Sequence, residues 1–95
     1  MLKKKTALHT ARATMLTPAQ LRAARSLVGW TRDDLAGRSG VFANTIKNFE
    51  SGTSDPKLST LHKWRRALEA AGVMFIDPDD QNGPGVRLRG AKGKR

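Results

Sequence analysis

Apolar residues recur every three or four positions in four stretches of the chain, which is the spacing of a helix with one buried face. The pattern predicts four helices, at about 18–28, 32–38, 43–51 and 56–71. The residues expected to face the core are Leu21, Ala24 and Val28, then Leu35 and Ala36, then Ile46 and Phe49, then Leu58, Leu61, Trp64 and Leu68.

Capping residues mark where three of these helices begin. Thr17 and Gln20 form a Thr-x-x-Gln capping box, and Thr31 with Asp34 forms a second box with acids in its first turn. Asp55 is expected to cap the fourth helix, just before a proline. The second and third helices are short and are joined by a tight glycine-containing turn, which is the helix-turn-helix arrangement.

After the fourth helix the periodicity changes from helical to extended. Residues 73–76 are apolar, residues 77–84 are rich in Asp, Asn, Gly and Pro, and residues 85–89 alternate. Two strands in a hairpin fit this pattern. Because an isolated hairpin is only marginally stable, we expect it to pack on the helices or to pair across a dimer. The aspartates of the turn lack the spacing and the terminal glutamate of a calcium loop.

The net charge points to a polyanionic partner. The 95 residues include 18 Lys and Arg against 8 Asp and Glu, a formal charge of +10, which favours nucleic acid over an anionic membrane. Residues 1–14 read as a basic flexible arm and residues 90–95 as a basic tail. The arm could contact DNA, could be a solvated tail, or could precede a true start at Met15.

The residue inventory argues against an enzyme and against a cofactor or metal. The chain has no cysteine and only two histidines, neither with a carboxylate neighbour at a credible spacing, and it has no phosphate-loop motif. Its basic start is not followed by the apolar segment of a signal peptide, and no stretch is long enough to span a membrane. We therefore expect a cytoplasmic protein without catalytic activity.

The third predicted helix carries a polar stripe opposite its apolar one. Asn44, Lys47, Asn48 and Ser51 follow the i, i+3, i+4, i+7 spacing and so share one face. Amide, ammonium and hydroxyl groups hydrogen-bond base edges and phosphates in the DNA major groove, which at about 12 Å across admits a helix. Taken alone, the stripe is equally consistent with an ordinary solvated helix face.

Several spaced motifs together resemble the Xre family of helix-turn-helix domains, which is related to lambda repressor and Cro. The resemblance covers about residues 16–71 and rests on Leu35-Ala36-Gly37-Arg38-Ser39-Gly40-Val41, Thr45-Ile46, Phe49-Glu50-Ser51-Gly52, Pro56 and Leu58-Ser59-Thr60-Leu61. It implies a mainly α fold: a lambda-repressor-like helix-turn-helix bundle of about four helices at residues 15–72, followed here by a β-hairpin extension at residues 73–89. The third helix would enter the major groove.

The resemblance also implies roles for individual residues. Base reading would fall to Ala43, Asn44, Lys47 and Asn48, backbone contacts to Thr31, Arg32, Ser51 and Lys57, and a structural ion pair to Arg25 and Glu50. Phe42 departs from the family, which usually has a capping Ser or Thr before this helix. We expect Phe42 to pack near Ile46, with contact to a thymine methyl group as the alternative.

These observations favour a sequence-specific double-stranded DNA-binding transcriptional regulator, a repressor that acts by occupying its operator as a homodimer. The alternative is the antitoxin of a toxin–antitoxin pair, which would bind a partner protein as well as its own operator. A third hypothesis is a basic module associated with RNA or ribosomes. Loss of specific DNA binding on changing Asn44 and Asn48 would separate the first hypothesis from the others.

Overall fold

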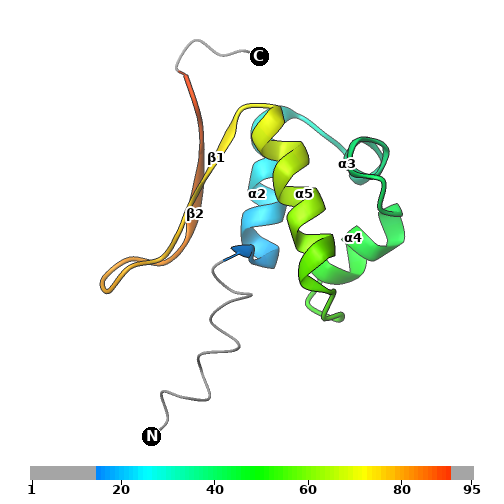
Figure 1. The fold of residues 1–95 in the computed structure, drawn as a ribbon, viewed down its shortest axis with the longest axis horizontal. Coiled ribbons are helices and arrows are strands. Elements are labelled where there is room, and N and C mark those ends of the chain that lie inside the picture. The colour runs from blue at the N-terminus through cyan, green and yellow to red at the C-terminus, as the bar shows by residue number, and fades with distance from the viewer. Residues whose placement is uncertain (1–14, 91–95) are drawn as a thin grey trace, which may run out of the picture.

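Four helices and a two-stranded hairpin make up residues 15–90, the part of the chain that the computed structural model describes. The elements are α2 (Pro18–Val28), α3 (Arg32–Ser39), α4 (Ala43–Glu50), α5 (Leu58–Ala70), β1 (Val73–Ile76) and β2 (Gly85–Leu88) (Figure 1). The predicted fold class is confirmed. The predicted arm at 1–14 and residues 91–95 of the predicted tail lie outside the described residues. No helix within residues 15–90 has the length and apolar character needed to cross a membrane.

The two predicted capping boxes are both formed. The Thr17 hydroxyl accepts from the Gln20 amide at 3.1 Å, and the Gln20 side chain accepts in return from the Thr17 amide at 2.9 Å. Thr31 and Asp34 repeat this exchange at 3.0 and 2.9 Å. Gly40 has a φ of 79° after α3, so the turn into α4 uses a left-handed conformation that favours glycine.

The core lies where α2, α3, α4 and α5 converge, as predicted from the helical periodicity. Trp64 is fully buried, and its ring lies 5.3 Å from that of Phe49, between centroids. The buried apolar residues are Leu16, Leu21, Ala24, Leu35, Ile46, Phe49, Leu61, Trp64, Leu68, Val73 and Phe75. Because α4 contributes Ile46 and Phe49 to this core, one face of α4 is fixed against the other helices.

The predicted start of the last helix is wrong. Its N-cap position falls on Lys57 rather than on Asp55, and the Lys57 side chain makes no capping hydrogen bond. Lys57 has an extended backbone, with φ −68° and ψ 156°, so the first turn cannot reach back to Pro56. Leu58, predicted to face the core, is exposed, and burial on α5 begins at Leu61.

The expected packing of Phe42 against Ile46 is also wrong. Phe42 is in the N-cap position of α4, and its side chain is 84% exposed. Ile46, one turn later, is fully buried. The chain enters α4 with φ −56° and ψ 143° at Phe42, and the ring is left outside the core.

The hairpin packs on the helices. β1 and β2 are antiparallel, with Val73 opposite Leu88 and Ile76 opposite Gly85. Both strands contact α2, and β1 also contacts α5. In Figure 1 the hairpin lies on one side of α2 and α5, whereas α3 and α4 lie on the other. The face of α4 that points away from the core is therefore not covered by the hairpin.

Candidate nucleic-acid interface

The polar stripe predicted on α4 lies on the outside of the molecule. Asn44, Lys47 and Ser51 are exposed and Asn48 is half-buried, while Ile46 and Phe49 face the core. This division follows from the helical period, because residues three and four positions apart share a face. The outer face of α4 thus offers two amides, an ammonium group and a hydroxyl to a partner.

The end of α4 is held by a small hydrogen-bond network. The Asn48 carbonyl accepts from the Thr53 amide at 2.9 Å and from the Thr53 and Ser51 hydroxyls at 3.1 Å each. These contacts satisfy a carbonyl that lacks a helical partner. The Ser51 hydroxyl proton is therefore engaged within the helix end, and Ser51 would have to release this contact to donate to a phosphate.

Glu50 anchors α4 to α2 and α3. Arg25 of α2 donates from Nε to Oε2 at 2.7 Å and from a terminal nitrogen to Oε1 at 2.8 Å, a bidentate pair. Arg32 of α3 donates from Nε to Oε1 at 3.1 Å. The Glu50 side chain is 1% exposed, the Arg25 side chain 16% and the Arg32 side chain 45%. The structure therefore brings the predicted pair of Arg25 and Glu50 together and adds a third member.

The charge state of Glu50 is set by two opposing effects. Burial opposes ionisation, but the hydrogen bonds from Arg25 and then Arg32 outweigh it and hold the pKa of Glu50 below its ordinary value. Glu50 is thus a carboxylate at neutral pH.

A hollow of about 540 Å³ joins the start of α3 to the start of α4. Its walls include residues predicted to contact the DNA backbone and residues predicted to read bases, together with one acid. The lining residues are Arg25, Thr31, Arg32, Asp33, Ala43, Asn44 and Lys47. Of the predicted base-reading and backbone-contacting residues, three lie outside the hollow: Asn48 on α4, Ser51 at the C-cap of α4, and Lys57 before α5.

Two of the arginines beside Glu50 were not assigned to it from the sequence. Arg22 donates to the Glu50 backbone carbonyl at 2.7 Å, and Arg32 shares the Glu50 carboxylate. The signal for Arg22 was present, since it lies three residues before Arg25 and so on the same face of α2. A cation at the C-terminal end of α4 is also favoured by the helix dipole.

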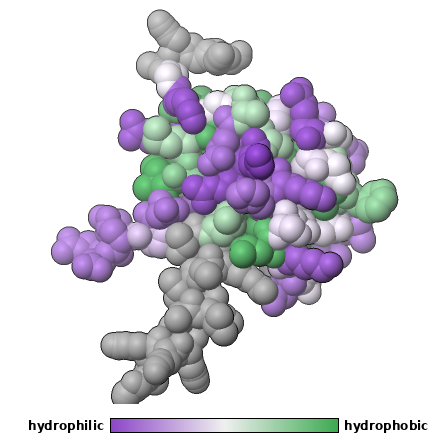
Figure 2. Space-filling view, viewed as in Figure 1, coloured by the Kyte–Doolittle hydropathy of each residue, from purple (hydrophilic) through white to green (hydrophobic). Residues whose placement is uncertain are grey.

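Hydrophilic and apolar side chains each form local patches on the face shown in Figure 2. In the space-filling view hydrophilic side chains gather over α5, and apolar patches lie at the left, over the hairpin (Figure 2). The exposed apolar residues of the hairpin are Met74, Ile76 and Leu88. Within residues 15–90 no cluster of three or more His, Cys, Asp or Glu could hold a metal ion.

Comparison with known proteins gives one family and two kinds of relative. Residues 19–75 match the family model described as a helix-turn-helix domain. Antitoxin HigA1 of Mycobacterium tuberculosis (strain H37Rv) is 51% identical over 37 residues, which are 39% of this chain and 25% of that protein. Antitoxin HipB of Escherichia coli (strain K12) is 39% identical over 57 residues, 56% of this chain and 65% of that protein. The chain thus spans less than two thirds of either relative.

Proposed function

Because this chain belongs to the helix-turn-helix domain family, we propose that it binds double-stranded DNA sequence-specifically and regulates transcription, as a repressor that occupies its operator. One observation carries the proposal: α4 exposes Asn44 and Lys47, with Asn48 half-exposed and Ser51 exposed at its C-cap, while the apolar face of α4 packs into the core. A helix presented in this way can enter the major groove without any rearrangement of the fold.

The base-reading residues of this proposal are Ala43, Asn44, Lys47 and Asn48. An asparagine side chain can pair with adenine in bidentate fashion: its amide nitrogen donates to N7 and its oxygen accepts from the N6 amino group. Lys47 can donate to a guanine or to a phosphate, and Ala43 offers only apolar contact. The two asparagines favour an operator that contains A·T pairs.

The backbone contacts of this proposal come from Thr31, Arg32, Ser51 and Lys57, which flank α4. Thr31 is exposed at the start of α3, and its hydroxyl accepts from the Asp34 amide, which leaves the hydroxyl proton available for a phosphate oxygen. Arg32 uses Nε for Glu50, and its side chain is 45% exposed. Its terminal nitrogens can therefore face a phosphate while Nε holds the fold.

The proposed function also specifies how the protein assembles and where in the cell it acts. A homodimer would place two α4 helices in successive major grooves, and its operator would then be a pseudo-palindrome with half-sites about one helical turn apart. A regulator of this kind acts in the cytoplasm, where the DNA of a bacterial cell lies. Residues 15–72 would form the DNA-binding domain, with residues 73–89 as its hairpin extension.

The salt dependence of affinity tests DNA binding. A protein that contacts several phosphates releases counterions, so log K against log [salt] falls steeply, by about 0.9 per phosphate contact. We expect Lys57→Ala to reduce this slope by about 1 and the matched control Lys63→Ala, on the exposed side of α5, to leave it unchanged. A flat slope for the unmodified protein would contradict the proposal.

An antitoxin is the second candidate function, and the similarity to HigA1 and HipB favours it. An antitoxin would bind a protein partner and repress its own operator, so the two candidates share the α4 surface. Co-expression with the product of a neighbouring toxin-like gene tests this reading. We expect a stable complex with the toxin-like protein, and we expect the double variant Asn44→Ala, Asn48→Ala to form it as well. If no complex forms, the antitoxin function is excluded and the regulator function remains.

A further inference from the structure

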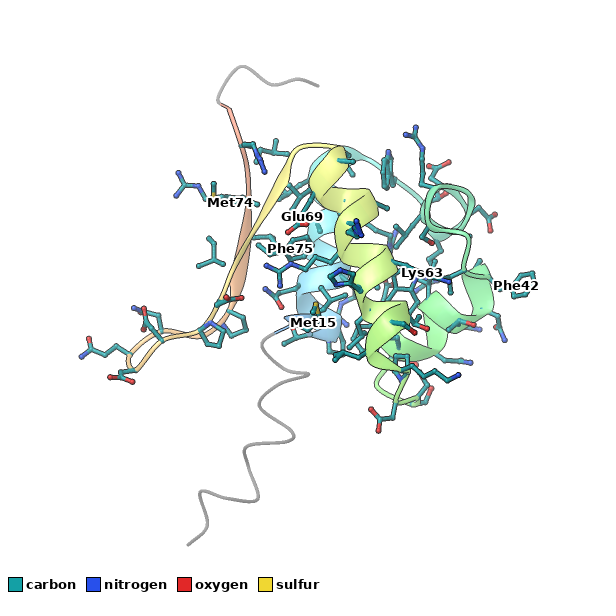
Figure 3. All side chains as sticks on the ribbon, viewed as in Figure 1. Met15, Phe42, Lys63, Glu69, Met74 and Phe75 are labelled. Carbon is teal, nitrogen blue, oxygen red and sulfur yellow. The ribbon has the colours of Figure 1, made fainter. Side chains whose placement is uncertain are left out.

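Phe42 is the most exposed large apolar residue of the described part of the chain. It is 84% exposed, whereas the other exposed large apolar residues lie between 39% and 46%. Figure 3 shows its ring at the start of α4, pointing away from the helices. Exposure of apolar surface to water is unfavourable, so a partner that covers the ring gains binding free energy from the contact.

The Phe42 side chain has no role in holding α4. It makes no capping hydrogen bond, and only its backbone carbonyl is used, accepting from the Thr45 amide at 3.0 Å and the Ile46 amide at 3.4 Å. The side chain also lies outside the buried core and the half-buried residues packed on it. Folding of the described residues therefore does not explain a phenylalanine at this position.

The ring is next to the residues that we propose to read bases. Phe42 directly precedes Ala43 and Asn44, both of which line the hollow between α3 and α4. Side chains on a helix lean toward its N-terminus, so the surface of Ala43 and Asn44 extends toward Phe42. If the N-terminal end of α4 enters the major groove, the ring reaches the base edges there.

We propose that Phe42 contacts the 5-methyl group of a thymine in the operator and is a specificity-determining residue. The inference rests on the proposed DNA-binding function. Thymine is the base that presents an apolar group in the major groove, and phenylalanine is one of the side chains that can contact it. Covering one methyl group changes affinity by about fourfold.

Thymine-by-thymine replacement in a selected operator tests the proposal. A duplex is first selected from a random library with the full-length protein, and each thymine is then replaced by deoxyuridine, which removes only the methyl group. We expect the unmodified protein to lose about fourfold in affinity at one position in each half-site. Phe42→Ala should bind the thymine-containing operator more weakly than the unmodified protein, and deoxyuridine at that position should not weaken its binding further. Phe42→Leu should keep part of the affinity difference between thymine and deoxyuridine.

The controls separate this inference from the function on which it rests. Lys63→Ala, on the exposed side of α5, should show the same uridine effect as the unmodified protein. Selection of no duplex at all would overturn the DNA-binding proposal and this inference with it. Specific binding with no uridine effect, or an equal effect in Phe42→Ala, would overturn the inference alone. Full operator binding by Phe42→Ala with loss of a protein partner would instead assign the ring to that partner.

Discussion

Arg25 and Glu50 form a bidentate ion pair, with N···O distances of 2.7 and 2.8 Å, that joins α2 to α4. The pair fixes the C-terminal end of α4, while Ile46 and Phe49 fix its apolar face. The orientation of the proposed DNA-reading surface therefore depends on a contact that does not touch DNA. This separation between supporting and reading residues makes the two roles experimentally distinguishable.

Breaking this pair is expected to destabilise the fold strongly. Glu50→Ala leaves the half-buried Arg25 without its carboxylate and also removes the partner of Arg32, so we expect a loss of about 3–5 kcal/mol in the free energy of unfolding. Asp33→Ala is the matched control, because Asp33 is an exposed acid on α3. Urea denaturation measures the free energy of unfolding of both variants. Equal values for Glu50→Ala and Asp33→Ala would show that the ion pair contributes little to stability.

The same carboxylate makes stability depend on acid pH. Its pKa is lowered in the folded state because the hydrogen bonds from the two arginines outweigh the effect of burial. The stabilisation is complete above the unfolded value of about 4.3 and is lost as the pH falls through the lower folded value. Unfolding curves between about pH 6 and pH 2 should therefore decline less steeply for Glu50→Gln than for the unmodified protein.

Two other acids contribute to the loss of stability at acid pH that remains in Glu50→Gln. Hydrogen bonds from backbone amides lower the pKa of Asp34, at the start of α3, and of Asp79, in the hairpin turn. Both are present in Glu50→Gln, so the difference between the two unfolding curves isolates Glu50. Superimposable curves would contradict the assignment of the acid-sensitive step to this residue.

Asparagine substitutions on α4 should separate reading from folding. Asn44→Ala and Asn48→Ala each remove a side chain that can contact adenine, with an expected loss of specific affinity worth about 1–3 kcal/mol. Neither side chain is part of the core, so thermal unfolding should change little for Asn44→Ala. Asn82→Ala, in the hairpin turn, is the matched control. Competition between operator and random duplex measures the effect, and unchanged preference would remove the asparagines from the interface.

A serine in place of Phe42 should stabilise the protein. The N-cap residues of α2 and α3 are threonines whose hydroxyls accept from the helix, whereas Phe42 provides no such acceptor for α4. Phe42→Ser supplies a hydroxyl acceptor at the N-cap of α4. We expect its free energy of unfolding to exceed that of Phe42→Ala by about 1 kcal/mol. Chemical denaturation measures the difference. Equal stability of the two variants would indicate that the start of α4 does not accommodate a cap.

The parts of this fold that could be predicted are those set by neighbouring residues. The capping boxes of Thr17 and Thr31 involve partners three residues away, and the buried stripe of α4 follows from one helical period. Phe42 and Leu58 were placed wrongly because apolar character indicates burial only when the backbone turns the side chain inward. That direction depends on how the chain enters each helix, which no local pattern records.

Most contacts between individual residues of distant segments could not be predicted from local pattern, for a similar reason. The predicted pair of Arg25 and Glu50 came from the family resemblance, whereas the share of Arg32 in it depends on the packing of α3. The roles of individual residues at the DNA surface remain proposals, since the exposure of Asn44 or Lys47 allows contact without specifying a base. Gln20 shows the limit most clearly, because its cap was predictable and its second role was not.

Gln20 links the start of α2 to the hairpin. Its side-chain nitrogen donates to the Gly85 carbonyl at 3.0 Å and lies 3.5 Å from the Ile76 carbonyl, while its oxygen completes the Thr17 box. Gln20→Ala would leave these partly buried groups without the Gln20 side chain as a partner, and we expect a loss of about 1–3 kcal/mol in the free energy of unfolding. Gln20→Glu keeps the capping oxygen but sets a carboxylate against carbonyl oxygens, so it should loosen the hairpin selectively.

Hydrogen exchange distinguishes these two variants. In Gln20→Glu the amides of β1 and β2 should exchange faster while those of α2 remain protected, because the capping box is retained. In Gln20→Ala both regions should exchange faster, since the cap and the link are lost together. Unchanged protection of the strands in both variants would mean that packing of Val73 and Phe75 alone holds the hairpin on the helices.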